Sequence, residues 1–176
     1  MHRRTLLVAA LGLLGGCLGG DAPVATTTTE TASTTTNPTG APAGVPVPGE
    51  DCAVTTLPEG EYPSLPTSLT EATGETFAID FEKAYATAEL EADEDVSVSG
   101  FDGWNARVVE RFDSGLLLTA SVQVDFGESG DGTRTMLGSS PSHGWYYVTE
   151  RFAARAPGAE YAEEPPTYTW EIVACG

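Results

Sequence analysis

The chain has 176 residues, of which 26 are acidic and eight are lysine or arginine, so its formal net charge is −18 at pH 7. This acidic excess argues against nucleic acid as a partner, because phosphate binding depends on lysine and arginine. It describes the solvent and the surface of the protein rather than its fold.

The N-terminus has the layout of an export signal. Arg3 and Arg4 precede an apolar run from Leu6 to Leu14, which is too short to cross a bilayer because spanning takes about 20 apolar residues. The run continues into Gly15-Gly16-Cys17 and resembles a lipobox, in which the cysteine thiol receives a diacylglyceryl group and cleavage falls just before it. We therefore predict a signal peptide over residues 1–16 and attachment to membrane lipid through Cys17.

The route of export is suggested by the two arginines. Arg3-Arg4-Thr5-Leu6-Leu7 resembles a twin-arginine (Tat) signal, whose pattern is two arginines, one free position and two apolar residues. His2 replaces the serine or threonine that usually precedes the pair, so the general secretory route stays open. Either route predicts a lipid-anchored protein on the extracellular side of the cell membrane.

Residues 17–51 are predicted to be the lipidated cysteine followed by a disordered linker. The stretch from Asp21 to Glu50 is rich in threonine and proline and has no large apolar side chain to bury, so the entropy cost of folding cannot be offset. Such stalks are often O-glycosylated, and the sequence leaves open whether this one is.

Residues 52–176 are predicted to form a single globular domain. Cys52 and Cys175 lie at its two ends, and the third cysteine is assigned to lipid. In an oxidising extracellular environment these two cysteines predict a disulfide, with two free thiols as the alternative.

The domain begins with a predicted amphipathic helix. Ser68 to Glu71 is a candidate capping box, and apolar residues fall at helical spacing from there to Glu91. Gly74 is a weak point near the start of this helix. The stripe expected to be buried is Phe77, Phe81, Ala84, Tyr85 and Ala88.

Strands are predicted for the rest of the domain. Alternation and turn residues place them at Val96–Val98, Trp104–Phe112, Leu116–Phe126, Trp145–Ala153 and Tyr168–Cys175, with Arg134–Met136 as a further pairing segment. The fold class is therefore α+β, with one N-terminal helix packed on an antiparallel sheet of about five strands. This order is similar to the topology of cystatin-like and NTF2-like folds.

A wider resemblance joins these features. The lipobox, the threonine- and proline-rich linker, and the pattern from Cys52 and Leu57-Pro58 through Phe81–Tyr85 to Cys175 resemble lipoproteins of the extremely halophilic archaea. The resemblance implies a surface adapted to molar salt, where the Debye length falls to about 3 Å. It carries no activity that can be transferred, and an acidic surface protein from a non-halophile is the alternative.

No catalytic, cofactor or metal site is predicted. His143 is the one histidine after the signal peptide, and Ser142 beside it offers a Ser/His/Asp alternative without a Gly-x-Ser-x-Gly elbow. We expect His143 to lie in a turn that leads into a strand. The acidic segments Asp93–Asp95 and Asp125–Asp131 lack the spacing of a known calcium loop.

Three adjacent aromatic residues are the candidate ligand-facing group. Trp145, Tyr146 and Tyr147 alternate between the two faces of a predicted strand, so at least one lies away from the helix. Half-exposed aromatics could bind a sugar, a peptide or a partner, and the alternative is that loops cover them.

The functional hypothesis is a non-enzymatic module that binds another envelope protein or an extracellular ligand. The alternative is a small enzyme or solute-binding component that uses a pocket between helix and sheet. The identity of the ligand and the oligomeric state are not predicted.

Overall fold

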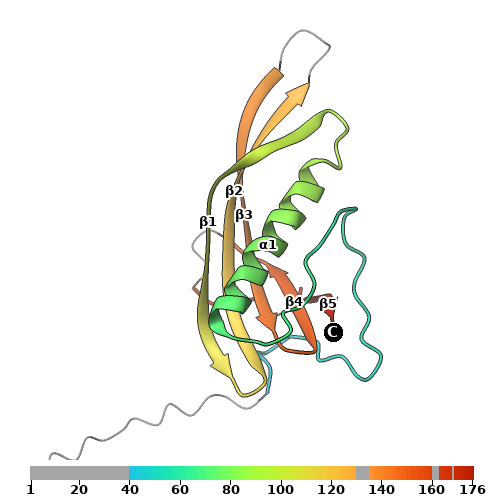
Figure 1. Ribbon diagram of the computed structural model, residues 1–176, viewed down its shortest axis with the longest axis vertical. Helices are drawn as coiled ribbons and strands as arrows, with labels where there is room; N and C mark the ends of the chain where they lie inside the picture. The colour runs from blue at the N-terminus through green and yellow to red at the C-terminus, as the bar shows by residue number, and fades with distance from the viewer. Residues whose placement is uncertain (1–39, 130–134, 160–162, 168) are drawn as a thin grey trace, which may run out of the picture. The chain divides into compact units, whose positions relative to one another are not determined.

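The computed structural model describes residues 40–129, 135–159, 163–167 and 169–176. These residues form α1 (Glu71–Leu90), β1 (Val96–Phe112), β2 (Gly115–Ser129), β3 (Thr135–Val148), β4 (Phe152–Pro157) and β5 (Glu171–Cys175). The strands form one antiparallel sheet in the order β1-β2-β3-β4-β5, and α1 packs against β1, β2 and β3 (Figure 1). The predicted α+β class, a helix on a five-stranded antiparallel sheet, is confirmed.

Several predictions fall outside the described residues. These are the signal peptide with Arg3 and Arg4, lipidation at Cys17, the linker as far as residue 39, and the ends of two predicted segments at Arg134 and Tyr168. Among the residues that are described, no helix is both long enough and apolar enough to cross a membrane.

The N-cap of the helix lies two residues after the one that the predicted capping box implied. Thr70 is the N-cap, and its hydroxyl accepts a hydrogen bond from the Thr73 amide while the Thr73 hydroxyl accepts one from the Thr70 amide. The prediction of a Ser68–Glu71 box was wrong because a threonine three residues after Thr70 supplies the reciprocal bond. Gly74, the predicted weak point, is buried where α1 approaches β2, and a Cβ there would lie 3.1 Å from Leu116 Cδ1.

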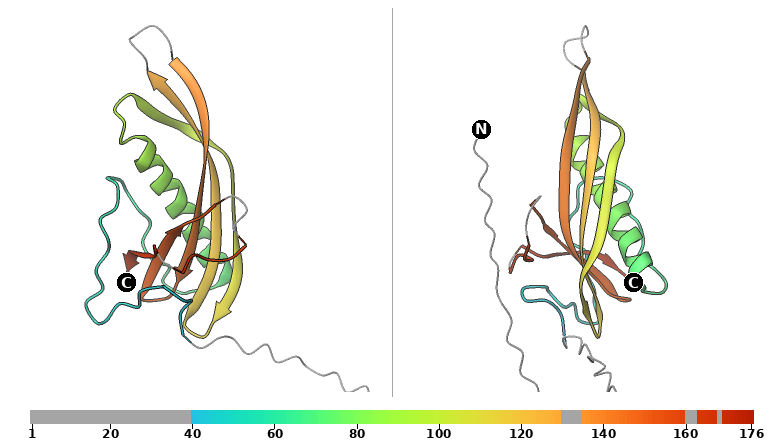
Figure 2. Two further views of the ribbon diagram at one scale, coloured as in Figure 1. Left: turned by 180° about the vertical axis from the view of Figure 1, so that it is seen from behind. Right: turned by 90° about the vertical axis from the view of Figure 1, so that its left-hand side faces the viewer.

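Helix α1 lies against the first three strands (Figure 2). Its buried side chains form the main core with residues of β2, β3, β4 and β5. Phe77, Phe81 and Ala88 of the predicted stripe are buried, whereas Ala84 and Tyr85 are half-buried. The core residues from helix and sheet are Phe77, Ala78, Phe81, Leu116, Leu118, Ala120, Tyr146, Val148, Ala153, Val173 and Ala174.

Strand β1 is one long edge strand where two were predicted. Its pairing with β2 continues through Gly100 and Gly103, and the register shifts between Val98 and Gly100 and between Phe101 and Gly103. The glycines therefore mark β-bulges inside the strand instead of a break between strands. Bulges on an edge strand also hinder pairing with another chain.

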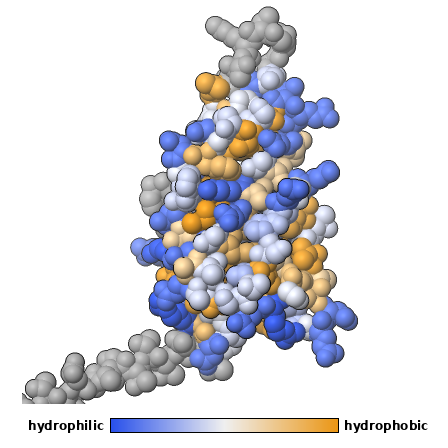
Figure 3. Space-filling view, in the orientation of Figure 1, coloured by the Kyte–Doolittle hydropathy of each residue, from blue (hydrophilic) through white to orange (hydrophobic). Residues whose placement is uncertain are grey.

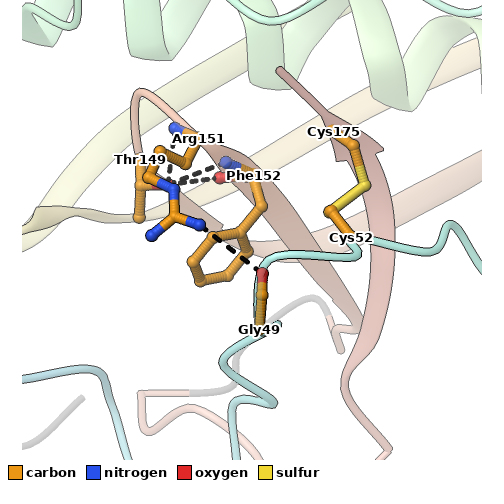
Figure 4. The surroundings of a disulfide bond; sticks show 6 residues. All are labelled: Gly49, Cys52, Thr149, Arg151, Phe152 and Cys175. Carbon is orange, nitrogen blue, oxygen red and sulfur yellow. Dashed lines mark hydrogen bonds between the residues drawn. A yellow bond between two sulfur atoms is a disulfide. The ribbon is translucent and has the colours of Figure 1, made fainter.

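The predicted strand Trp145–Ala153 is divided into the end of β3 and the start of β4. Thr149 closes the turn between them, since its hydroxyl accepts hydrogen bonds from the amides of Arg151 and Phe152 (Figure 4). Strand β3 also extends back to Thr135, so His143 lies inside a strand, opposite Ser121, and not in a turn as predicted.

A second apolar cluster covers the face of the sheet that α1 leaves free, near β4 and β5. The sheet contributes Leu117, Trp145, Tyr147, Phe152, Ala154, Ala156 and Ile172, and the residues that cover them are Val45 and Trp170. Val45 is buried although residues 17–51 were expected to form the linker. The packed part of the chain therefore begins before Cys52.

The predicted disulfide joins the segment that precedes the helix to the last strand of the sheet. Cys52 and Cys175 form it with a Cα–Cα distance of 5.9 Å, and the bond links the segment before the helix to β5 (Figure 4). Nearby, a terminal nitrogen of Arg151 donates to the carbonyl of Gly49. On the face seen in Figure 3, hydrophobic side chains lie in separate patches among hydrophilic ones.

Candidate functional site

A charged cluster lies in the interface between α1 and the sheet. Glu82 is completely buried, and its carboxylate accepts hydrogen bonds from Ser142 at 2.6 Å, from Arg155 at 2.9 and 3.1 Å, and from the Tyr146 hydroxyl. Arg155 reaches it from β4 with 8% of its surface exposed. Its guanidinium also stacks on the Tyr85 ring, 3.8 Å from the centroid.

The cluster alters the protonation of its members. Burial, followed by the charge of Glu82, raises the pKa of Tyr146 well above its usual value. Burial alone would lower the pKa of the Arg155 guanidinium, but Tyr146 and Glu82 outweigh this effect and raise it. Arg155 therefore stays charged and Tyr146 stays protonated at any physiological pH.

Each charged group in this cluster is paired and hydrogen-bonded, as a buried charge requires. Glu82 directly follows Phe81, a residue of the predicted buried stripe. It was not predicted from the sequence because an acidic side chain on a surface helix is expected to face solvent. The glycine opposite it was the available signal. A Cβ at Gly144 would overlap the Glu82 carboxylate, so this glycine permits the close approach.

An open cleft lies at the end of the sheet near the start of α1. It has a volume of about 860 Å³ and is bordered by the first turn of α1, the β1–β2 turn, the β3–β4 turn and the segment around Gly40 and Val47. An exposed ion pair between Glu71 and Arg111 lies on its rim, and Ser114 forms a 2.7 Å hydrogen bond with Tyr147 in its wall. We call this the end cleft.

A smaller polar cavity lies on the sheet face opposite α1. Its volume is about 360 Å³, and we call it the sheet-face pocket. Its lining residues are Asn105, Arg107, Thr119, Ala120, Ser121, His143, Gly144, Trp145, Gly158 and Ala159.

The three predicted ligand-facing aromatics are not exposed. Trp145, Tyr146 and Tyr147 have exposed fractions of 1%, 0% and 1%. Tyr146 packs under α1, and the other two pack in the second apolar cluster beneath Val45 and Trp170. Trp145 and Tyr147 do lie on the face away from α1, as predicted, but that face is covered, so the ligand-facing interpretation is wrong and the stated alternative holds. Tyr147 reaches the end cleft through its wall, and Trp145 reaches the sheet-face pocket.

The Ser/His alternative also finds no support in the geometry. Ser142 contacts Glu82 on the helix side, whereas its neighbour His143 lies on the other face of the strand. Within the described residues, no three histidine, cysteine, aspartate or glutamate side chains lie close enough together to hold a metal ion.

Comparison with known proteins adds no relative: no family model, no curated protein and no solved structure matches the chain.

Proposed function

We propose that the chain is an exported, lipid-anchored protein whose domain is a non-enzymatic binding module on the extracellular side of the cell membrane. The observation that carries the proposal is the Cys52–Cys175 disulfide, which ties the segment before α1 to β5. Structural disulfides persist in oxidising environments outside the cytosol. They agree with the signal peptide and lipobox expected over residues 1–17.

A binding role is favoured over a catalytic one by the state of the charged groups. The buried Glu82, Tyr146 and Arg155 satisfy one another and lie under α1, where a substrate has no access. General acids and bases need a pKa near the working pH. Both shifted groups of this cluster, Tyr146 and Arg155, have pKa values raised still further from neutrality.

A second candidate function is the capture of a small solute, and the end cleft favours it. Its volume of about 860 Å³ lies within the range of small-molecule sites, and apolar and charged side chains line it together. The core fills the main helix–sheet interface, so a solute would bind at the end of the helix, not beneath it. A cystatin- or NTF2-like topology, with a helix before a strand meander, is the finer fold assignment that we propose.

The anchor is tested by mass spectrometry of protein extracted from the membranes of the native host. We expect a diacylglyceryl adduct on Cys17, no residue before it, and a cross-linked peptide containing Cys52 and Cys175. In a Cys17→Ser variant the adduct should be absent and the protein should leave the membrane fraction. Intact Met1 with unmodified Cys17 would disprove the anchor.

The two candidate functions are separated by blocking the end cleft. Val47 is 67% exposed and lines the cleft, whereas Val54 is 47% exposed and does not line it. In native mass spectrometry, a solute that co-purifies with the wild type should be lost in Val47→Trp and kept in Val54→Trp. If no variant changes the bound mass, solute capture in this cleft is rejected and the surface-module proposal stands.

Adaptation to high salt, which the acidic composition suggests, has its own test. Repulsion among surface acids destabilises the compact state at low salt and is screened at molar salt. We expect the free energy of unfolding in urea to rise steadily as potassium chloride is raised from about 0.1 M to about 1 M, where the Debye length falls from about 10 to about 3 Å. A free energy that does not change with salt would contradict the adaptation.

A further inference from the structure

The sheet-face pocket is built from the cross-strand register of three strands. One row consists of Asn105, Ser121 and His143, which are directly opposite one another on β1, β2 and β3. Because side chains two residues apart share a face, the next row lies beside it and consists of Arg107, Thr119 and Trp145. The pocket floor therefore carries hydrogen-bonding groups from five side chains and one indole ring.

Arg107 brings positive charge to this floor in a chain whose net charge is −18. Its Nε donates to Thr119 Oγ1 at 3.3 Å, which orients the guanidinium. The described part of the chain has two ion pairs, Arg111 with Glu71 and Arg155 with Glu82. Arg107 takes part in neither of them. The terminal nitrogens of its planar fork make no hydrogen bond to a described residue.

His143, which also lines this pocket, carries an unsatisfied polar atom. Its Nε2 is buried and has no hydrogen-bond partner, the one such side-chain atom found among the described residues. Leaving a buried polar atom unpaired is unfavourable, so such an atom usually has a hydrogen-bond partner. Gly158 closes the wall beside it, since its amide donates to the His143 carbonyl at 2.9 Å.

We propose that the sheet-face pocket binds an oxyanion group, such as a carboxylate or sulfate, on a small ligand. Arg107 pairs with the oxyanion through its terminal nitrogens, the geometry that carboxylates and phosphates prefer. The Ser121 hydroxyl, the Asn105 amide and His143 Nε2 supply further polar contacts. A volume of about 360 Å³ is at the lower end for small-molecule sites and suits a single acidic sugar or a smaller anion.

The inference goes beyond the proposed function and does not depend on the lipid anchor or on the end cleft. It can fail while the anchor is confirmed, and the reverse is equally possible. It also accounts for the finding that Arg107 has no carboxylate partner among the described residues.

The test is a titration in which a ligand is added to the full chain in detergent at constant ionic strength. Proton–nitrogen NMR spectra monitor each addition. The probes are sodium acetate, sodium sulfate and sodium glucuronate, with glucose as the neutral control. We expect saturable shifts of the Ser121, His143 and Gly158 amides and of the His143 ring nitrogens with at least one anion and none with glucose. Glucuronate binding more tightly than acetate and sulfate would assign an acidic sugar, whereas equal affinities would assign the oxyanion alone.

Two arginine variants make the test specific. Arg107→Gln should weaken binding at least tenfold, which corresponds to about 1.4 kcal/mol. Arg111→Gln removes the same charge from the same strand outside the pocket and should change affinity less than twofold. Equal weakening in both variants, or shifts that rise linearly without saturating, would overturn the proposal, as would the absence of any shift.

A third variant tests the role of the imidazole. His143→Phe keeps a ring of similar size but removes Nε2, and we expect weaker binding with the fold intact. Unchanged affinity in this variant, with an unchanged amide spectrum elsewhere, would remove His143 from the proposed site.

Discussion

Ser142 and His143 are neighbours on β3, yet they belong to two different polar clusters on opposite faces of the sheet. On the helix side, Ser142 donates to a buried carboxylate that also binds Arg155 and Tyr146, so every group has a partner. On the other side, and counting only the part of the chain that the structure describes, the buried Nε2 of His143 has no hydrogen-bond partner and Arg107 has no counter-charge. We call the Glu82, Ser142, Tyr146 and Arg155 group the sealed cluster, and it contributes to specifying the fold. The group around His143 and Arg107 in the sheet-face pocket is the open cluster, whose unpaired polar atoms could bind a ligand.

Of the substitutions in these two clusters, one at Glu82 should change the free energy of unfolding most. Glu82→Gln leaves Arg155 buried without a counter-charge, which should lower the free energy of unfolding by about 3–5 kcal/mol. The control is Glu71→Gln, which breaks the exposed pair of α1 with Arg111 and should cost less than about 1 kcal/mol. Urea unfolding monitored by circular dichroism measures both.

Replacing the whole pair sharpens this prediction. A double variant with Glu82→Met and Arg155→Met removes both charges and should regain most of the stability lost in Glu82→Gln, because an apolar pair needs no compensation. If the double variant is as unstable as the single one, the cost arises from lost packing and not from an unpaired charge.

A smaller effect is expected where the sheet approaches the sealed cluster. Gly144→Ala places a Cβ against the Glu82 carboxylate and should cost about 1–3 kcal/mol through overpacking. Gly103→Ala on β1 is the matched control, since no atom lies within 4 Å of a Cβ at that position. Equal losses in the two variants would show that the close approach at Gly144 is unimportant.

Alkaline pH should affect the sealed cluster more than the open one. Burial raises the folded-state pKa of Tyr146 above the 10.0 of a free tyrosine, and burial with the Glu89 hydrogen bond raises the pKa of Tyr85 to about 12. The unfolded chain therefore releases these protons first. The resulting stability is fully present below pH 10 and is lost as the pH rises towards the folded-state values.

The measurement is the free energy of unfolding in urea at a series of pH values from neutral to alkaline. Each tyrosine that keeps its proton contributes at most about 1.4 kcal/mol per pH unit to the slope. Tyr85→Phe should make the decline above pH 10 less steep. A decline that begins well below pH 10 would contradict this explanation.

The smallest effect is expected on the open face. His143→Phe removes the buried unpaired nitrogen, so the free energy of unfolding should stay the same or rise by up to about 1 kcal/mol. A loss comparable to that of Glu82→Gln would mean that the imidazole is a structural group, and the contrast between the two faces would no longer hold.

Much of the fold followed from local patterns in the sequence. The strand Leu116–Phe126 was predicted with its apolar face correct, because strict alternation reports which face is buried. The disulfide followed from the positions of Cys52 and Cys175. The helix was placed correctly, although its cap was not.

What the sequence did not reveal depends on contacts between distant residues. Nothing near Glu82 indicates that Arg155, which is 73 residues away, will meet it under the helix. Burial of Trp145 and Tyr147 depends on Val45 and Trp170 crossing the free face of the sheet, which no local pattern predicts. The sheet-face pocket was likewise missed because its rows appear only once the strand register is known.

The Cys52–Cys175 bond also determines what happens when the chain is cut. A protease that cleaves one peptide bond anywhere between these residues leaves two fragments joined through sulfur, because the bond closes a loop with a sequence separation of 123. A nicked molecule would run as one species on a gel without reductant and as two with it. Damage inside the loop therefore does not by itself release the C-terminal fragment from the N-terminal part of the chain.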